Sequence, residues 1–381
     1  MKKVICCIFL ILAACAPKPT ALPATATSAP VTFTSTVAAS ATDTLTPLPT
    51  DTATLPPTET ASPTPRLAIH SGDASRLVRI NQLTHPDVRS LVFFPDSTWL
   101  LIASGNTSRG NFLASLWWPD QNQKYDLASA VGIVWEAAFS PDGRWVAYAI
   151  DNQSNSIRGY VVDLASKTQL ATLLGDGTAY SLAFSPDGTR LALGGLGAYP
   201  NGAIWIYDTK TWEMINNFPV TGQVVDDLVF PPDGTILYSS GNDGAIRAWN
   251  TADGTLVSHF TFKAQANRIA LSPDGSLLAS TYCTKNDPDG CTKGGVVIWH
   301  VPDGKMLKTF NDIAISVAFS PDGSLLGTGG GSHDSFVRFR YTATWDEVGQ
   351  VATLADSLAF SPDGRLLATA DYEMVTIWAI Q

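Results

Sequence analysis

A serine, a histidine and an aspartate, the residue types of nucleophilic acyl-transfer sites, stand together in the stretch Ser332-His333-Asp334. Neighbours on one loop rarely face one another as a catalytic triad must, so we expect Asp334 to be a structural turn residue. The chain has no Gly-x-Ser-x-Gly, His-Glu-x-x-His or phosphate-binding glycine motif. Its histidines are scattered along the sequence, at His70, His85, His259, His300 and His333. The sequence therefore predicts no catalytic residue, no cofactor and no metal site.

Two cysteines offer a different chemistry. Cys283 and Cys291 lie in one segment, TYCTKNDPDGCTKGG (281–295). Outside the cytoplasm, two thiols this close across a hairpin connection oxidise, so we expect a loop-closing disulfide. The alternative is a calcium loop, although the segment lacks its first ligand and its distal glutamate. The candidate ligands would be Asn286, Asp287 and Asp289.

The elements that would hold these residues recur along the chain. Each repeat has a short apolar run, a turn close to Ser-Pro-Asp-Gly, and a second apolar run, as in LAFSPDGTRLALGG (182–195). Proline presets the backbone of such a turn, aspartate bonds the nearby backbone, and glycine takes the conformation that other residues avoid. The turn prolines recur 41 to 48 residues apart, at Pro95, Pro141, Pro186, Pro232, Pro273, Pro321 and Pro362.

Each repeat also contains a third run with aromatic or β-branched residues and a fourth, more polar run, such as IWIYD (204–208) and TLVSHFTF (255–262). Four strands in about 45 residues, repeated, are typical of propeller blades. The last repeat ends at Gln381 after its third strand, whereas a separate strand, 75–84, precedes the first repeat. We predict an all-β, seven-bladed propeller over residues 67–381 that is closed when strand 75–84 pairs with the last blade.

The repeat VFPPDGTILYSSGNDGAIRAWNTADGTLV, which begins at residue 229, resembles a WD40 repeat. Ser240, Asp243 and Trp249 stand where that family uses a hydrogen-bonded Ser, Asp and Trp set. No repeat has the family's Gly-His pair or a literal Trp-Asp ending, and residues 139–163 are equally similar to the repeats of TolB-like propellers. The chain as a whole resembles a bacterial WD40-repeat lipoprotein.

The resemblance also implies a set of binding residues. In WD40 propellers, the residue four positions before the last aromatic position of the inner strand opens onto the face around the central channel. The matching positions here are Arg89, Trp135, Tyr180, Asp226, Asn267, Ile315 and Asp356, and His333 is a further candidate on that face. Trp, Tyr and Arg are enriched in binding hot spots, although packing in the channel is an equal alternative for Trp135 and Tyr180.

The N-terminal segment indicates where the protein works. Lys2 and Lys3 precede an apolar run that is too short to span a bilayer, and LAAC (12–15) follows it. Leu-Ala-Ala-Cys resembles a bacterial lipobox, which implies a signal peptide over residues 1–14 and a lipid on Cys15. The segment 15–66 is rich in Thr, Pro and Ala, a composition that is typical of a disordered stalk. We expect an extracytoplasmic protein that a lipid anchors to the bacterial membrane, on the cell surface or the periplasmic side.

Charge limits the partners that the protein can bind. The chain has 34 Asp and Glu against 24 Lys and Arg, a net charge of −10, so it offers no broad basic face for nucleic acid. We expect a monomeric binding or scaffold module, not an enzyme, that recognises a protein or a cell-envelope polymer through one face of the propeller. The alternative is a hydrolase or lyase that acts on a small molecule or glycan in the channel.

Overall fold

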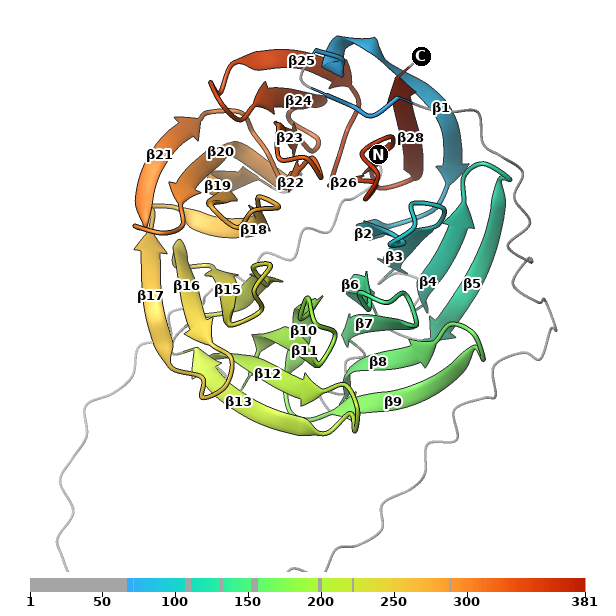
Figure 1. The fold of residues 1–381 in the computed structure, drawn as a ribbon, viewed down its shortest axis with the longest axis vertical. Helices are drawn as coiled ribbons and strands as arrows, with labels where there is room; N and C mark the ends of the chain where they lie inside the picture. Colours follow the sequence, from blue (N-terminus) through green and yellow to red (C-terminus); the bar gives the residue numbers. More distant parts are fainter. Residues whose placement is uncertain are drawn as a thin grey trace, which may run out of the picture.

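The computed structural model describes residues 67–70, 72–106, 111–130, 133–151, 157–197, 201–220, 223–287 and 290–380. Within these ranges the chain forms seven four-stranded antiparallel sheets arranged in a ring (Figure 1). The single helical element among them is the 3-10 turn η1 (Ala74–Arg76), so no helix of the described chain could cross a membrane. The expected all-β, seven-bladed propeller is confirmed. The predicted signal peptide 1–14, Cys15 and the segment 15–66 lie outside the described residues.

Each sheet is one blade, and its four strands are ordered from the channel to the outer rim. Blades 1 and 2 consist of β2 (Val88–Phe93), β3 (Leu100–Asn106), β4 (Asn111–Trp118), β5 (Gln123–Ala130), β6 (Ile133–Phe139), β7 (Trp145–Asp151), β8 (Ile157–Asp163) and β9 (Thr168–Leu174). Blades 3 and 4 consist of β10 (Thr178–Phe184), β11 (Arg190–Leu196), β12 (Gly202–Asp208), β13 (Met214–Val220), β14 (Val225–Val229), β15 (Ile236–Gly241), β16 (Ala245–Asn250) and β17 (Leu256–Thr261). Blades 5 and 6 consist of β18 (Gln265–Leu271), β19 (Leu277–Asp287), β20 (Gly290–His300), β21 (Lys305–Phe310), β22 (Ser316–Phe319), β23 (Leu325–Gly329), β24 (Phe336–Tyr341) and β25 (Glu347–Ala352). Blade 7 consists of β26 (Ser357–Phe360), β27 (Leu367–Ala370), β28 (Met374–Ile380) and β1 (Leu77–Thr84).

The middle strands of the blades form the core. In β7 and β11 the five central residues are all buried, whereas five of the six residues of the outer strand β17 are exposed. A middle strand has a neighbouring blade on each face, so both of its faces must be apolar. This arrangement explains why the second runs of the repeats are continuously apolar instead of alternating.

The Pro-Asp-Gly turns are stabilised by bonds within each turn and pack against the turns of the neighbouring blades. In blade 3, Ser185 Oγ donates a hydrogen bond of 2.6 Å to Asp187 Oδ1, which lowers the pKa of the Asp187 carboxyl below its usual range. In blade 4, Gly234 has a φ of +65°, and a Cβ there would lie 3.3 Å from the ring of Pro186 in the preceding turn. A glycine is needed at this position both for its backbone conformation and for the close approach of the neighbouring turn.

The ring closes between the two ends of the described chain. β1 pairs antiparallel with β28, from Leu77 opposite Ile380 to Thr84 opposite Met374. The closing strand begins at Leu77, two residues later than the expected 75–84, because Ala74–Arg76 form the turn η1. Ile69 and Ala74, just before the strand, are buried in the same cluster as blade 6 and blade 7 residues.

The side-chain hydrogen bonds observed in blade 4 differ from the set that the WD40 resemblance implied. Trp249 Nε1 donates to Ser239 Oγ at 2.8 Å, and Ser240 Oγ donates instead to the carbonyl of Asn267 in blade 5 at 2.8 Å. Asp243 forms an ion pair with Arg247. Side chains alternate between the two faces of a strand, so Ser239 shares a face with Trp249 whereas Ser240 faces the next blade.

Candidate functional site

The inner strands all begin at one face of the ring, here called the top face, and run toward the Pro-Asp-Gly turns at the other. Near the start of five inner strands, the pairing with the second strand skips a residue. A residue in such a β-bulge has no partner in the ladder, and its side chain is turned away from the regular direction. The bulged residues are Arg89, Trp135, Tyr180, Asp226 and Asn267, and in blade 5 the bulge also includes Arg268. The sequence had singled out five of these six without any sign of the bulge that presents them.

Four side chains form a continuous group at the top face, here called the arginine-aromatic cluster: Arg89, Trp135, Tyr180 and Tyr372. The guanidinium carbon of Arg89 lies 5.3 Å from the ring centroid of Trp135 and 5.6 Å from that of Tyr372. Trp135 and Tyr180 meet edge to face, with centroids 5.4 Å apart. Blades 7, 1, 2 and 3 each contribute one of these side chains, so the cluster covers about half of the ring.

Two carboxylates border this cluster. Burial raises the pKa of Tyr372, and hydrogen bonding to the Asp87 side chain adds to the shift, while the charge of Arg89 opposes it. The pKa of Asp356 is raised to about 6, chiefly by burial and also by the nearby Asp371, while the charge of Arg89 opposes the shift. The charge of Arg89 therefore lies among acidic neighbours and is not an isolated positive patch.

The remaining predicted top-face residues have other neighbours. Asp226 has a pKa raised to about 7, chiefly by burial, and the charge of Arg268 opposes this shift. The carbonyl of Asn267 accepts the bond from Ser240 described above. Ile315, whose amide donates to the carbonyl of Gly329, and Asp356 directly precede their inner strands. The structure thus brings Arg89, Trp135, Tyr180 and Asp356 together, whereas Asp226 belongs to the group around Arg268.

The next residue on each inner strand forms a ring of side chains around the channel. Its members, from blade 1 to blade 7, are Ser90, Glu136, Ser181, Asp227, Arg268, Ser316 and Ser357. At four junctions the side-chain oxygen of one blade accepts a hydrogen bond from a backbone amide of the next: Leu91 to Ser357, Leu182 to Glu136, Leu228 to Ser181, and Ile269 to Asp227, at 2.9 to 3.2 Å. An inner strand is a sheet edge with unpaired amides, and these side chains satisfy them.

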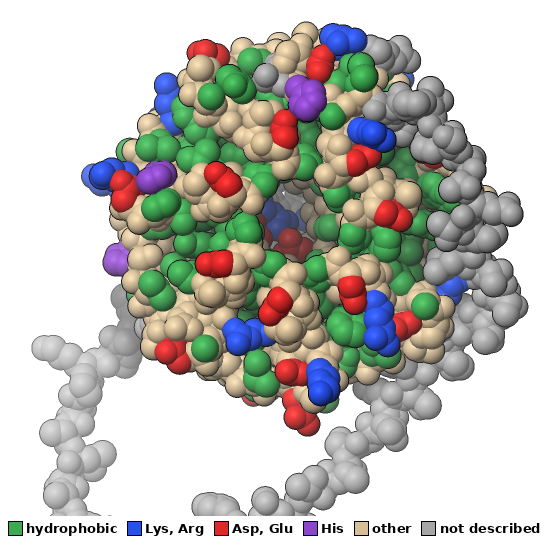
Figure 2. Space-filling view, viewed as in Figure 1, with side chains coloured by type: hydrophobic (Ala, Val, Ile, Leu, Met, Phe, Trp, Pro, Cys, Tyr) green, Lys and Arg blue, Asp and Glu red, His purple; other side chains and the backbone are tan. Residues whose placement is uncertain are grey.

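Arg268 is the one cation of this ring. Its Nη1 lies 3.9 Å from Glu136 Oε1 and 3.9 Å from Asp227 Oδ1. Glu136 belongs to blade 2 and Arg268 to blade 5, and these blades are not adjacent, so the contact reaches across the channel. Figure 2 shows acidic side chains spread around the central opening, and both basic and acidic side chains inside it. Glu136, Asp226, Asp227 and Arg268 are here called the Arg268 network.

Burial sets the electrostatics of this network. The pKa of Glu136 is raised to about 7, chiefly by burial and also by the negative charge of Asp227, while Arg268 opposes the shift. Burial also raises the pKa of Asp227, and Arg268 and the amide of Ile269 oppose that shift. One guanidinium thus faces more carboxyl groups than it can neutralise, and near neutral pH the network holds protons.

His333 reaches the neighbouring blade and not Asp334. Its Nε2 lies 3.1 Å from Asp287 Oδ2 at the end of β19, and its Nδ1 lies 3.1 Å from Ser332 Oγ. Asp334 is bound by Arg338 and donates its amide to Gly331, which agrees with a structural turn role. Although His333 is on the top face, the structure places it against the β19–β20 hairpin, away from the arginine-aromatic cluster.

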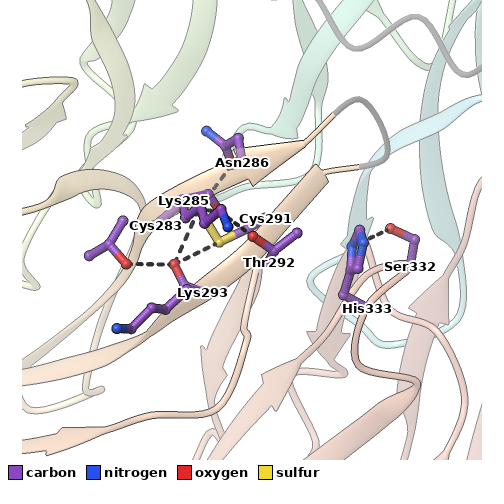
Figure 3. Close-up of a disulfide and its surroundings, with 9 residues drawn as sticks. Cys283, Lys285, Asn286, Cys291, Thr292, Lys293, Ser332 and His333 are labelled. Carbon is purple, nitrogen blue, oxygen red and sulfur yellow. Dashed lines mark hydrogen bonds between the residues drawn. A yellow bond between two sulfur atoms is a disulfide. The ribbon is translucent and has the colours of Figure 1, made fainter.

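The structure contains a disulfide between Cys283 and Cys291, with Cα atoms 5.9 Å apart, in the extended hairpin of β19 and β20 (Figure 3). These two strands have 11 residues each and extend past the other strands of their blade. Among the described residues, no three His, Cys, Asp or Glu side chains could hold a metal ion. Asp289, a candidate ligand of the calcium alternative, lies outside the described residues.

Sequence reasoning missed Tyr372, Glu136 and Arg268. Glu136 and Arg268 each directly follow a predicted top-face residue, and a charged residue there replaces the serine that four other repeats have. The replacement of serine by a charged residue could therefore have identified Glu136 and Arg268 from the sequence. Tyr372 comes from a loop between the second and third strands, and no repeat position marked it.

Comparisons with known proteins agree with the repeats. The family model "WD domain, G-beta repeat" matches residues 213–250 and 304–339. The chain is 30% identical over 128 residues to p21-activated protein kinase-interacting protein 1-like of Gallus gallus, which is 33% of each chain. It is 25% identical over 175 residues to Protein HIR1 of Cryptococcus neoformans var. neoformans serotype D, 41% of this chain and 19% of that one. It is also 28% identical over 158 residues to telomerase protein component 1 of Rattus norvegicus, 39% of this chain and 5% of that one.

The matched part of the chain spans a third or less of the length of these relatives. The matched residues run from the outer strand of blade 3 into blade 4 and from the outer strand of blade 5 into blade 6, and the remaining blades have the same four-stranded order. The chain is therefore a seven-bladed β-propeller that contains WD40 repeats.

Proposed function

We propose that this protein is a binding module that recognises another protein through its top face, outside the cytoplasm, while a lipid on Cys15 anchors it to a membrane. The observation that carries the binding role is the arginine-aromatic cluster. Its rings and guanidinium belong to the residue types that dominate binding hot spots, and several blades hold them in place. A rigid surface of this kind loses little conformational entropy when it binds.

Two further observations support a binding role. The printed name of the Gallus gallus relative describes an interacting protein. In addition, Glu136 and Asp227 in the channel accept hydrogen bonds from backbone amides of neighbouring blades, so these carboxylates help to join the blades. We therefore favour recognition at the top face over hydrolysis or elimination in the channel.

The double variant Trp135→Ala, Tyr180→Ala should lose its partner. We expect the purified full-length protein to capture a specific protein by cross-linking in native envelope fractions, and the double variant to capture at least about tenfold less, because two contacting anchors are removed.

The matched control is Trp99→Ala, Tyr125→Ala, which removes another contacting Trp-Tyr pair with ring centroids 5.9 Å apart. That pair lies next to the Pro95-Asp96-Ser97 turn of blade 1, at the opposite face. Circular dichroism should show that both variants are folded. Equal capture by the two double variants would contradict the top-face assignment.

The proposed anchor has its own test. Cys15→Ser should abolish incorporation of radiolabelled palmitate and should release the protein from the membrane fraction, because stable anchoring requires the acyl chains. Cys283→Ser serves as the control, since it removes a cysteine of the propeller and should leave labelling unchanged. Labelling of Cys15→Ser at the wild-type level would refute the lipid anchor.

A further inference from the structure

The charges at the top of the channel are unbalanced. Arg268 contacts Glu136 and Asp227, and the charge of Asp226 also acts on its guanidinium. The two distances that the structure gives for Arg268, to Glu136 and to Asp227, are both 3.9 Å, longer than charge-assisted hydrogen bonds. If all three carboxyls are ionised, two negative charges remain uncompensated.

Asp226 provides an independent sign of a missing partner. Its Oδ2 is buried and has no hydrogen-bond partner among the described residues. Buried polar atoms in folded proteins are nearly always bonded, so a buried carboxylate oxygen without a donor indicates that something else supplies one. Asp226 is also the bulged residue near the start of its inner strand, at the top face.

The aromatic neighbours of this network suit a cation. Trp135 directly precedes Glu136, and Tyr180 directly precedes Ser181, whose hydroxyl donates to Asp227 Oδ1 at 3.1 Å. The ring of Trp135 already stacks on the guanidinium of Arg89. The face of an aromatic ring attracts guanidinium and ammonium groups, so rings at this end of the channel favour a cation over an anion.

We propose that the upper opening of the channel between blades 2 and 5 is a subsite for one cationic side chain of the partner, a guanidinium or an ammonium, which Asp226 and Glu136 bind. The subsite rests on the proposed function, because it assumes a protein partner. An organic cation fits better than a metal ion, since no three carboxylates or histidines of the described residues converge on one point. The chain's net charge of −10 further favours a basic segment as the ligand.

The test uses small probes, so that it does not depend on knowing the partner. Isothermal titration calorimetry compares N-acetyl-arginine methylamide and N-acetyl-lysine methylamide with the neutral isostere N-acetyl-citrulline methylamide on the full-length protein. We expect at least one cationic probe to bind about tenfold more tightly than citrulline. Binding should release protons near neutral pH, because a bound cation lowers the raised pKa values of Glu136 and Asp226.

Asp226→Asn should weaken binding of the cationic probe about tenfold and reduce the proton release. The matched control is Asp253→Asn, which makes the same change in the same blade at the opposite end of the strands and should bind like the wild type. The proposal is overturned if neither cationic probe binds, if citrulline binds equally well, or if Asp226→Asn leaves the affinity unchanged. Each of these results is separable from partner capture, which depends on Trp135 and Tyr180.

Discussion

Deleting residues 67–84 should destabilise the propeller by about 5 kcal/mol or more. The deletion removes β1 and so leaves β28 as an unpaired edge along the register from Leu77 to Thr84. It also removes Ile69, which is 2% exposed. Burial of one large aliphatic side chain is worth about 1.5–3 kcal/mol, and the pairing of a whole strand is lost in addition. Urea denaturation of the full-length chain and of the deletion variant measures the difference.

Addition of the missing strand as a peptide provides the control. A synthetic peptide of residues 67–84 should restore part of the lost stability in a concentration-dependent way, because it binds only the folded ring. Two outcomes would contradict the closure described here: an unchanged free energy of unfolding after the deletion, or a destabilised variant that the peptide does not rescue at any concentration.

Replacing Arg268 by methionine should have the second large effect. The variant leaves Glu136 and Asp227 without their cation, and removing one partner of a buried ion pair costs about 3–5 kcal/mol. Methionine keeps the length and apolar character of the side chain, so the loss reports the charge. The free energy of unfolding at about pH 8 is the quantity to measure, since the carboxyls are then ionised.

The loss should shrink as the pH falls. The pKa of Glu136 is raised from 4.5 to about 7 in the folded protein, so the folded state binds a proton more tightly than the unfolded state. Stability from this group therefore falls as pH rises from about 4.5 to about 7, and without Arg268 the pKa is raised further. At about pH 5, where Glu136 is protonated, we expect the destabilisation to be smaller by at least about 1 kcal/mol, since one pKa unit corresponds to about 1.4 kcal/mol.

Arg144→Met is the matched control. Arg144 pairs with Asp163 at 3.2 Å, but its side chain is 63% exposed. Such a surface pair contributes less than about 1 kcal/mol. If Arg268→Met costs no more than Arg144→Met at about pH 8, or if its cost does not change with pH, the network across the channel does not stabilise the ring.

Much of the fold could be predicted because the residues of each repeat specify its turn and its strands. The proline, aspartate and glycine of each turn specify a tight hairpin, and continuous apolar runs require cover on both faces. Seven such units have only one efficient way to bury those faces, which is to pack around an axis. The closing strand could also be predicted, because a single additional strand precedes the seven repeats and the last repeat lacks a fourth strand.

The candidate site was only partly predictable. The resemblance to WD40 repeats marked Arg89, Trp135 and Tyr180, because in that family one position of each inner strand opens onto the top face. The same reasoning placed Ser240 in a bond with Trp249, yet Ser239 makes that bond, because a shift of one residue changes the face of a strand. It also placed His333 on the top face without revealing that its partner, Asp287, comes from another blade.

The sequence by itself determined the number of blades, the position of the turns and the pair of cysteines, because these depend on local pattern and on repetition. The positions expected at the top face came from the resemblance to WD40 repeats. Only the tertiary structure decided that Arg89 lies between Trp135 and Tyr372, and that Arg268 reaches Glu136 across the channel. These contacts join residues of different blades, and long-range contacts of this kind follow from how the blades are arranged around the ring and not from any local signal in the chain.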